Sequence, residues 1–339
     1  MTAGPAPGRA ADPARTVFFG SGAFAVPVLD VVQAHPRLRL VAVVTGPDRP
    51  AGRSKAMSPT PVAVRAREIG VPVLQPTRVR NSEAVAEIAA LQPDLGVLAD
   101  YGQIIPRALL ELPAHGILNV HPSLLPRHRG ATPIPATIAA GDPEGGVSII
   151  RMDDGIDTGP VVAARRWPLE GRERASAFEA LAGIEGAALL RDTIAAWLDG
   201  TAVASPQRAE AASVTSPFRR EDGRLDPSRP ARELERQVRA NEPWPGTFVD
   251  TGLGRVAVLA AGLSETQDGD TPGLLVEEDG RLALATSEGR LVIEEAKREG
   301  RRPTGGREFL RGQGRLVGTH IAEPAAPLDI PARIEAPSR

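Results

Sequence analysis

Three side chains near the middle of the chain have types and spacings suited to acyl chemistry. Asn119 and His121 lie two residues apart at the end of an apolar run, Gly116–Val120, that reads as a β-strand. Residues two apart in a strand project to the same side. A carboxamide donor beside an imidazole can polarise a carbonyl and transfer a proton. A strand-end Asn or His can also be only a hydrogen-bonding loop residue, and this reading stays open.

The third side chain is a carboxylate in the segment Met152–Gly159, which follows a predicted strand over Val147–Met152. We expect Asp157 to orient His121 and to favour its charged form. The segment lacks the oxygen-ligand spacing and the final Glu of a calcium loop. A plain Asp-Gly turn remains the competing interpretation.

The composition narrows the chemistry further. The chain has no cysteine, which excludes disulfides, thiolate catalysis and cysteine-ligated zinc or iron–sulfur sites. Only five histidines are present, so a multi-histidine metal site is not expected. Ser123 lies between proline and leucine residues and has no nucleophile-elbow pattern. The sequence therefore favours direct transfer over a covalent acyl-enzyme.

Cations are concentrated in two segments of a chain whose formal net charge is −2. The polar loop after the second predicted strand begins at Gly46 and carries Arg49, Arg53 and Lys55. It is longer than the usual strand-to-helix connection of about two to six residues. The stretch Lys297–Arg315 contains seven cations and two anions. Such a local patch can bind a phosphate backbone, although either segment can also be simply solvated.

Strands and helices alternate from Arg15 to a long helix predicted over Ser176–Leu198. This alternation predicts an α/β domain with a Rossmann-like, mostly parallel sheet. Ligands bind at the carboxyl ends of the strands of such sheets, where the candidate residues lie. The turn Gly20–Gly22 does not complete a dinucleotide fingerprint, because the third glycine and the later acidic residue are missing. After Pro230, a short helix and about five short strands predict a small OB-like β-barrel.

These patterns divide the chain as follows: a disordered tail over 1–14, a catalytic domain over 15–200, a linker over 201–229, a β-barrel domain over 230–325 and a second tail over 326–339. No apolar run is long enough to span a bilayer, and the first residues lack the apolar region of a secretory signal. We therefore expect a cytoplasmic protein.

Several motifs together resemble the folate-dependent formyltransferase family. The segment Asn119–Pro126 (NVHPSLLP), followed downstream by Asp153–Gly159 (DDGIDTG), is similar to the signature of that family. The loop Pro47–Arg53 (PDRPAGR), the segment Pro243–Gly246 (PWPG) and the C-terminal barrel resemble the branch that acts on methionyl-tRNA. The loop Gly20–Phe24 departs from the usual family pattern.

The resemblance implies transfer of a formyl group from 10-formyltetrahydrofolate to the α-amino group of methionyl-initiator-tRNA, without a metal and by a monomer. It assigns catalysis to Asn119, His121 and Asp157; folate contacts to Ser123, Leu124, Leu125 and Pro126; and contacts with the tRNA to Arg49, Arg53 and Lys55. Two alternatives stay open. The chain could formylate an amino sugar nucleotide, or it could be a non-catalytic tRNA-binding protein that retains the fold.

Overall fold

The computed structural model of the protein describes residues 12–51 and 56–322. The chain divides into two compact units. The first contains Met1–Pro122, Val147–Arg165 and Ala180–Gln207, and the second contains Ser123–Gly146, Arg166–Glu179 and Arg208–Arg339. The predicted domain limits and the monomeric state remain predictions. Among the described residues, no helix is long and apolar enough to cross a membrane.

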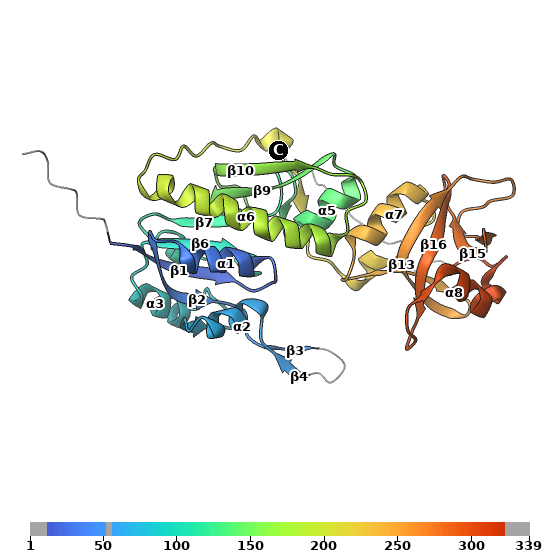
Figure 1. Ribbon diagram of the computed structural model, residues 1–339, viewed down its shortest axis with the longest axis horizontal. Helices are drawn as coiled ribbons and strands as arrows, with labels where there is room; N and C mark the ends of the chain where they lie inside the picture. Colours follow the sequence, from blue (N-terminus) through green and yellow to red (C-terminus); the bar gives the residue numbers. More distant parts are fainter. Residues whose placement is uncertain (1–11, 52–55, 323–339) are drawn as a thin grey trace, which may run out of the picture. The chain divides into compact units, whose positions relative to one another are not determined.

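A seven-stranded sheet is the centre of the N-terminal half, with the order β10-β9-β7-β6-β1-β2-β5. Figure 1 shows this succession from β10 at one edge to β2. Its strands are β1 (Ala14–Gly20), β2 (Leu38–Val44), β5 (Val73–Leu74), β6 (Leu95–Ala99), β7 (Ile117–His121), β9 (Glu144–Arg151) and β10 (Val161–Pro168). β1 pairs in parallel with β2 and β6, and the pairs β2–β5 and β6–β7 are also parallel. The mostly parallel α/β prediction is confirmed.

One strand departs from the simple alternation, because β9 runs antiparallel to β7. The helix between them, α5 (Pro133–Ala140), packs against α7 (Ala231–Ala240) of the second unit. The Arg236 guanidinium of α7 donates to the carbonyl oxygen of Ala140 at 3.4 Å. The spacing of apolar residues in the sequence does not distinguish this helix from one that connects two parallel strands.

The helices of the first unit are α1 (Ala25–Ala34), α2 (Pro61–Glu68), α3 (Ser82–Ala90), α4 (Arg107–Leu110) and most of α6 (Ala175–Leu198). Alternate residues of β1 serve different faces of the sheet, and Val17 and Phe19 join one buried cluster with Ile88 of α3. Helix α6 closely approaches another strand of the sheet: a Cβ atom added to Gly186 would lie 2.7 Å from Val120. The predicted long helix is confirmed to within one residue.

The long polar loop contains a hairpin that the sequence did not predict. β3 (Arg49–Ala51) pairs antiparallel with β4 (Ala56–Ser58), and Figure 1 shows the two strands extending from the sheet. Arg49 is exposed on β3. Arg53 and Lys55 lie outside the described residues.

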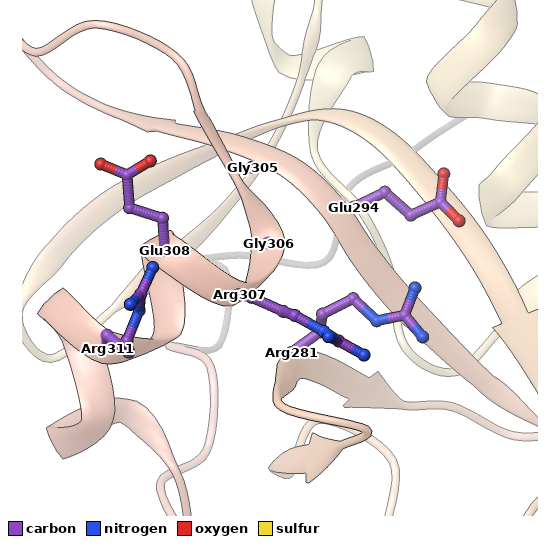
Figure 2. A pocket seen from close by; sticks show the side chains of 7 residues that line it. All are labelled: Arg281, Glu294, Gly305, Gly306, Arg307, Glu308 and Arg311. Carbon is purple, nitrogen blue, oxygen red and sulfur yellow. The ribbon is translucent and has the colours of Figure 1, made fainter.

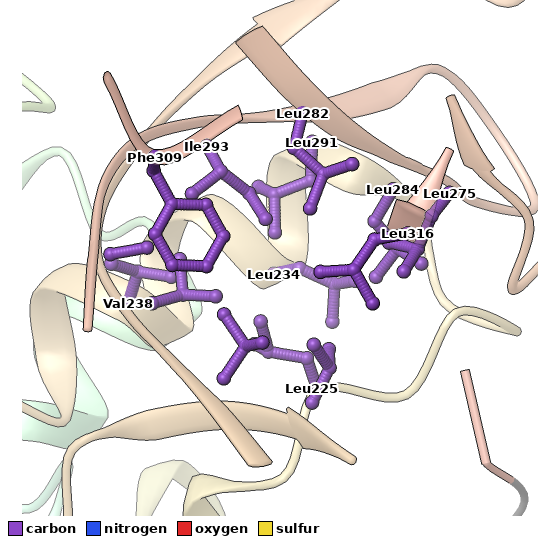
Figure 3. Packing of buried hydrophobic residues seen from close by; sticks show 14 of the residues in the cluster. Leu225, Leu234, Val238, Leu275, Leu282, Leu284, Leu291, Ile293, Phe309 and Leu316 are labelled. Atoms are coloured by element: carbon purple, nitrogen blue, oxygen red, sulfur yellow. The ribbon is translucent and has the colours of Figure 1, made fainter. Parts of the chain in front are cut away.

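The C-terminal part of the second unit is a curled antiparallel sheet with the order β12-β13-β16-β15-β14. Its strands are β12 (Thr247–Thr251), β13 (Gly254–Ser264), β14 (Leu275–Glu278), β15 (Arg281–Ala285) and β16 (Arg290–Arg298), and β17 (Thr304–Gly305) pairs with β16. Leu234 and Val238 of α7 and Phe309 of α8 (Gly306–Gln313) enter the same buried core (Figure 3). This architecture confirms the predicted small β-barrel.

The rest of the second unit includes short elements within the expected linker. β11 (Val214–Thr215) pairs in parallel with β8 (Arg129–Gly130). The 3₁₀ turns η1 (Ala209–Ala211) and η2 (Arg220–Gly223) lie on either side of β11, and η3 (Gly314–Leu316) follows α8. The segment is therefore bonded to other parts of the chain and is more than a spacer.

Candidate active site

Strand β7 positions the first two candidate residues. All five of its residues are buried, because the strand lies between β6 and β9. Asn119 and His121 are each 5% exposed, and they are two residues apart in the strand. Strand geometry therefore directs both side chains toward the same face. The rigid pairing of their backbone on both sides limits how far either side chain can move.

The loop after β9 brings Asp157 to these two side chains. The Asn119 amide nitrogen Nδ2 donates to Asp157 Oδ1 at 3.0 Å. His121 Nδ1 lies 3.6 Å from Asp157 Oδ2. The Asp157 side chain is only 15% exposed, so water screens these interactions poorly. The structure thus gathers the three residues that the sequence singled out, with the carboxylate beside the imidazole.

The Asp157 loop has a constrained backbone. Asp157 itself has a φ of +52°, in the left-handed region that non-glycine residues rarely adopt. A Cβ atom at Gly159 would lie 1.8 Å from the carbonyl oxygen of Arg151, so only glycine fits there. Asp153 Oδ1 accepts from the Gly155 backbone and from the Thr158 hydroxyl at 3.1 and 2.6 Å. Asp153 therefore supports the turn, while Asp157 faces the imidazole.

Sequence reasoning missed one residue that holds this loop. Gln207 Nε2 donates to the carbonyl oxygens of Asp157 and Gly159, at 2.8 and 2.7 Å. Gln207 lies in the stretch expected to be a linker, fifty residues beyond Asp157. A single glutamine in a polar segment carries no periodicity or motif, so no sequence signal pointed to it.

The segment Ser123–Pro126 belongs to the second unit and is held by its own hydrogen bonds. Ser123 is 1% exposed, and its hydroxyl donates to the carbonyl oxygen of Arg127 at 2.7 Å. The Ser213 backbone N–H donates to the carbonyl oxygen of Pro126 at 3.3 Å. The serine hydroxyl thus stabilises the turn, and the part assigned to it and to Leu124, Leu125 and Pro126 in folate binding remains a prediction.

A buried contact between a histidine and a carboxylate, also missed by sequence reasoning, lies just beyond that segment. His128 Nε2 is 2.8 Å from Asp142 Oδ2, and its ring is 2% exposed. Arg127 donates to the other carboxylate oxygen of Asp142 at 2.6 Å. The His128 backbone N–H donates to the Ser213 hydroxyl at 2.9 Å. These contacts fix the end of the Ser123–Pro126 segment within the second unit.

The basic C-terminal stretch surrounds an open cavity of about 470 Å³ (Figure 2). Its lining residues are Arg281, Glu294, Gly305, Gly306, Arg307, Glu308 and Arg311. Figure 2 shows Arg281 and Arg307 reaching toward the same region, with Arg311 further along α8. No salt bridge to Arg307 or Arg311 is found among residues 12–51 and 56–322. The cavity therefore presents guanidinium groups to solvent.

The described part of the chain contains no group of three or more His, Asp or Glu side chains arranged to hold a metal ion. The chemistry available at Asn119, His121 and Asp157 is hydrogen bonding to a developing oxyanion, together with proton transfer.

Two family profiles match the chain. The profile described as "Formyl transferase" matches residues 14–190, and "Formyl transferase, C-terminal domain" matches residues 217–314. The methionyl-tRNA formyltransferase of Roseiflexus castenholzii is 40% identical over 305 residues, which cover 90% of this chain and 97% of that protein. The methionyl-tRNA formyltransferase of Myxococcus xanthus is 41% identical over 299 residues, which cover 88% of this chain and 95% of that protein.

Solved structures share the fold at low identity. An N-formyltransferase from Helicobacter canadensis, in complex with folinic acid and dTDP-3-aminofucose, has a TM-score of 0.61 at 16% identity and covers 83% of this chain and 99% of its own. HypX from Aquifex aeolicus in complex with tetrahydrofolic acid has a TM-score of 0.57 at 16% identity and covers 93% of this chain and 50% of its own. Because both profiles match and the curated relatives are about 40% identical over most of the chain, the chain belongs to the methionyl-tRNA formyltransferase family.

Proposed function

We propose that this enzyme transfers the formyl group of 10-formyltetrahydrofolate to the α-amino group of methionyl-initiator-tRNA in the cytoplasm. The observation that carries the proposal is the meeting of Asn119, His121 and Asp157 in a chain of this family. Their arrangement supports stabilisation of a tetrahedral intermediate, which formyl transfer between two nitrogens requires.

The reaction begins when the uncharged methionyl amine attacks the formyl carbon. A carbon–nitrogen bond forms and the carbonyl electrons move to oxygen, which becomes an oxyanion. Asn119 has two amide hydrogens, and one is already directed at Asp157, so the other is oriented by that bond. This second hydrogen and a ring N–H of His121 donate to the oxyanion.

Collapse of the intermediate completes the transfer. The bond between the formyl carbon and folate N10 breaks, and N10 takes up the proton that the amine loses, so no net proton is consumed. Asp157 keeps the imidazole oriented during this exchange, because its carboxylate lies 3.6 Å from His121 Nδ1. Holding two substrates together supplies much of the remaining acceleration.

The folate co-substrate is assigned to the segment containing Ser123, Leu124, Leu125 and Pro126. Support comes from the hydrogen bonds that order this segment, namely Ser123 to Arg127 and Ser213 to Pro126. It also comes from the Helicobacter canadensis and Aquifex aeolicus proteins of the same fold, whose structures hold folinic acid and tetrahydrofolic acid.

The tRNA is assigned to two basic regions, one in each unit. The first is the polar loop whose strand β3 carries Arg49; Arg53 and Lys55 of the same sequence segment lie outside the described residues. The second is the cavity at the start of α8, which Arg281 and Arg307 line, although Arg281 also lies 3.6 Å from the Asp279 carboxylate. Guanidinium groups in this setting suit phosphate oxygens, because they donate two parallel hydrogen bonds.

The test is a formylation assay with 10-formyltetrahydrofolate and either charged initiator tRNA or charged elongator methionine tRNA. We expect formyl-methionyl product on the initiator tRNA. Formylation of an amino sugar nucleotide, with no product on tRNA, would refute the proposed substrate. Tight tRNA binding with no formyl transfer to any amine would instead indicate a binding protein.

A further inference from the structure

Gln207 is the residue outside the predicted trio that most directly fixes the geometry of the site. Its amide nitrogen donates both of its hydrogens along the Asp157 loop, to the carbonyl oxygens of Asp157 and Gly159 at 2.8 and 2.7 Å. Both bonds are short and well formed for an amide donor. Gln207 therefore bridges two peptide groups of the loop from a segment fifty residues away.

The backbone segment bonded by Gln207 has an unfavourable conformation at Asp157. Asp157 occupies the left-handed region with a φ of +52°, at a cost that surrounding structure must offset. The direction of its side chain follows from that backbone conformation. One carboxylate oxygen meets Asn119 and the other faces His121, so a small rotation of the peptide would weaken both interactions.

We propose that Gln207 is a positioning residue, which acts through the Asp157 backbone to keep the carboxylate directed at His121 and Asn119. The inference rests on the proposed function, since it concerns the same reaction. The two hydrogen bonds of Gln207 reach neither the imidazole nor the Asn119 amide. Gln207 affects kcat through the orientation of the Asp157 carboxylate. Misplacing a reacting group by about 1 Å can cost about 100-fold in rate.

The donor character of the Gln207 side chain is the essential property. Both partners are carbonyl oxygens, which only accept hydrogen bonds. In Gln207→Glu the side chain keeps its length and shape, but an oxygen replaces the nitrogen and faces the two carbonyl oxygens. In Gln207→Met the length is retained without any donor. A role in packing alone would tolerate both changes.

The chain offers a matched control in Gln237 of α7. Its Nε2 donates to the carbonyl oxygens of Asp222 and Arg224, at 2.9 and 3.0 Å, within the second unit. Gln237 is 9% exposed and its bonds involve none of the three candidate catalytic residues. Gln237→Met therefore removes the same two kinds of hydrogen bond, together with the 3.3 Å bond that Gln237 Oε1 accepts from Arg229, at a position away from the three candidate catalytic residues.

The experiment measures kcat, both KM values and Tm for the full-length wild type and for Gln207→Met, Gln207→Glu and Gln237→Met in the formylation assay. We expect kcat to fall by about 10- to 100-fold in both Gln207 variants, with the KM values for folate and tRNA unchanged. Gln237→Met should show a similar fall in Tm with kcat retained. Should Gln207→Met not fold, Gln207→Glu carries the same comparison.

The inference is overturned when either folded Gln207 variant keeps the wild-type kcat, or when Gln237→Met loses as much kcat as the Gln207 variants. It is also overturned when KM rises while kcat stays constant, because that result assigns Gln207 to substrate binding. An inactive wild type overturns the proposed function and this inference together, whereas an active wild type with unaffected Gln207 variants overturns the inference alone.

Discussion

Replacing Asn119 by alanine tests the chemistry of the site most sharply. The Asn119 amide makes a 3.0 Å hydrogen bond to Asp157 and, in the proposed reaction, a second one to the oxyanion. Asn119→Ala removes both. The side chain is 5% exposed and lies on a strand paired on both sides, so the backbone has little freedom to compensate.

The two losses affect different quantities. Removing one oxyanion-hole donor raises the barrier by about 2.7–4 kcal/mol, which is about 100- to 1,000-fold in kcat. Removing a hydrogen bond to a charged group costs about 1.5–3 kcal/mol of folding stability. Kinetic and stability measurements on the same variant therefore report the two hydrogen bonds separately.

Asn119→Asp gives the complementary perturbation. It retains the shape of the side chain but places a second carboxylate at about the 3.0 Å separation now occupied by the Asn119–Asp157 hydrogen bond. Like charges at that distance repel strongly, so we expect this variant to lose at least as much kcat as Asn119→Ala.

The assay is single-turnover formylation with saturating 10-formyltetrahydrofolate and charged initiator tRNA, accompanied by urea unfolding. The reasoning is refuted if Asn119→Ala turns over at the wild-type rate while folded. It is also refuted if Asn119→Asp is more active than Asn119→Ala, since that would show that no oxyanion forms against this side chain.

Four further predictions concern the rest of the molecule. Arg290→Met removes the ion pair of the Asp270 carboxylate, which is 3% exposed and keeps a hydrogen bond from the Gln267 backbone N–H, so the unfolding free energy at pH 7 should fall by about 3–5 kcal/mol in urea titrations; an unchanged midpoint would contradict this. The Arg290 guanidinium holds the pKa of Asp270 below its ordinary value of 3.8. The difference in unfolding free energy between the wild type and Arg290→Met should therefore be complete above pH 3.8 and should shrink as the pH falls through the lower pKa of Asp270 in the folded protein. A difference that grew on acidification would contradict the direction of this pKa shift. Tyr101→Phe should raise the unfolding free energy by about 1 kcal/mol without changing kcat, because the hydroxyl is buried with no hydrogen-bond partner among the described residues, and loss of stability would argue for a hidden partner. Arg307→Gln and Arg311→Gln should each reduce the slope of log tRNA affinity against log salt by about 1, and an unaltered slope would exclude a phosphate contact.

Much of the fold could be predicted because the spacing of apolar residues along the sequence follows the geometry of strands and helices. The runs around Phe18, Val43 and Val97 are continuously apolar, as strands covered on both faces must be. Helix α7 shows the opposite pattern, with Leu234 and Val238 spaced to face the barrel core. Such periodicities reflect local geometry, and they survive in a single sequence.

The candidate site was predictable for a related reason. Asn119 and His121 alternate correctly at the carboxyl end of a strand. The rule for parallel sheets does not account for their contact with Asp157, because β9 runs antiparallel to β7 and its last residue, Arg151, pairs with Leu118 near the amino end of β7. The residue types predicted a hydrogen-bond donor, a proton-transferring imidazole and an orienting carboxylate, and the family resemblance assigned them to formyl transfer. Both assignments remain to be tested by the variants above.

The features that sequence reasoning missed depend on long-range contacts. The antiparallel pairing of β9 with β7 and the packing of α5 on α7, about a hundred residues away in sequence, have no local pattern that reveals them. Gln207 acquires its importance from the carbonyl oxygens of a distant loop. The β3–β4 hairpin lies in a polar segment without the alternation that identifies a half-buried strand.

The most direct test of the account is the transfer of isotopically labelled formyl groups from 10-formyltetrahydrofolate to charged initiator tRNA, measured as labelled formyl-methionine after release from the tRNA. We expect labelled formyl-methionine with the wild type and essentially none with folded His121→Ala. Absence of labelled formyl-methionine with the folded wild type, or equal labelling with His121→Ala, would contradict it.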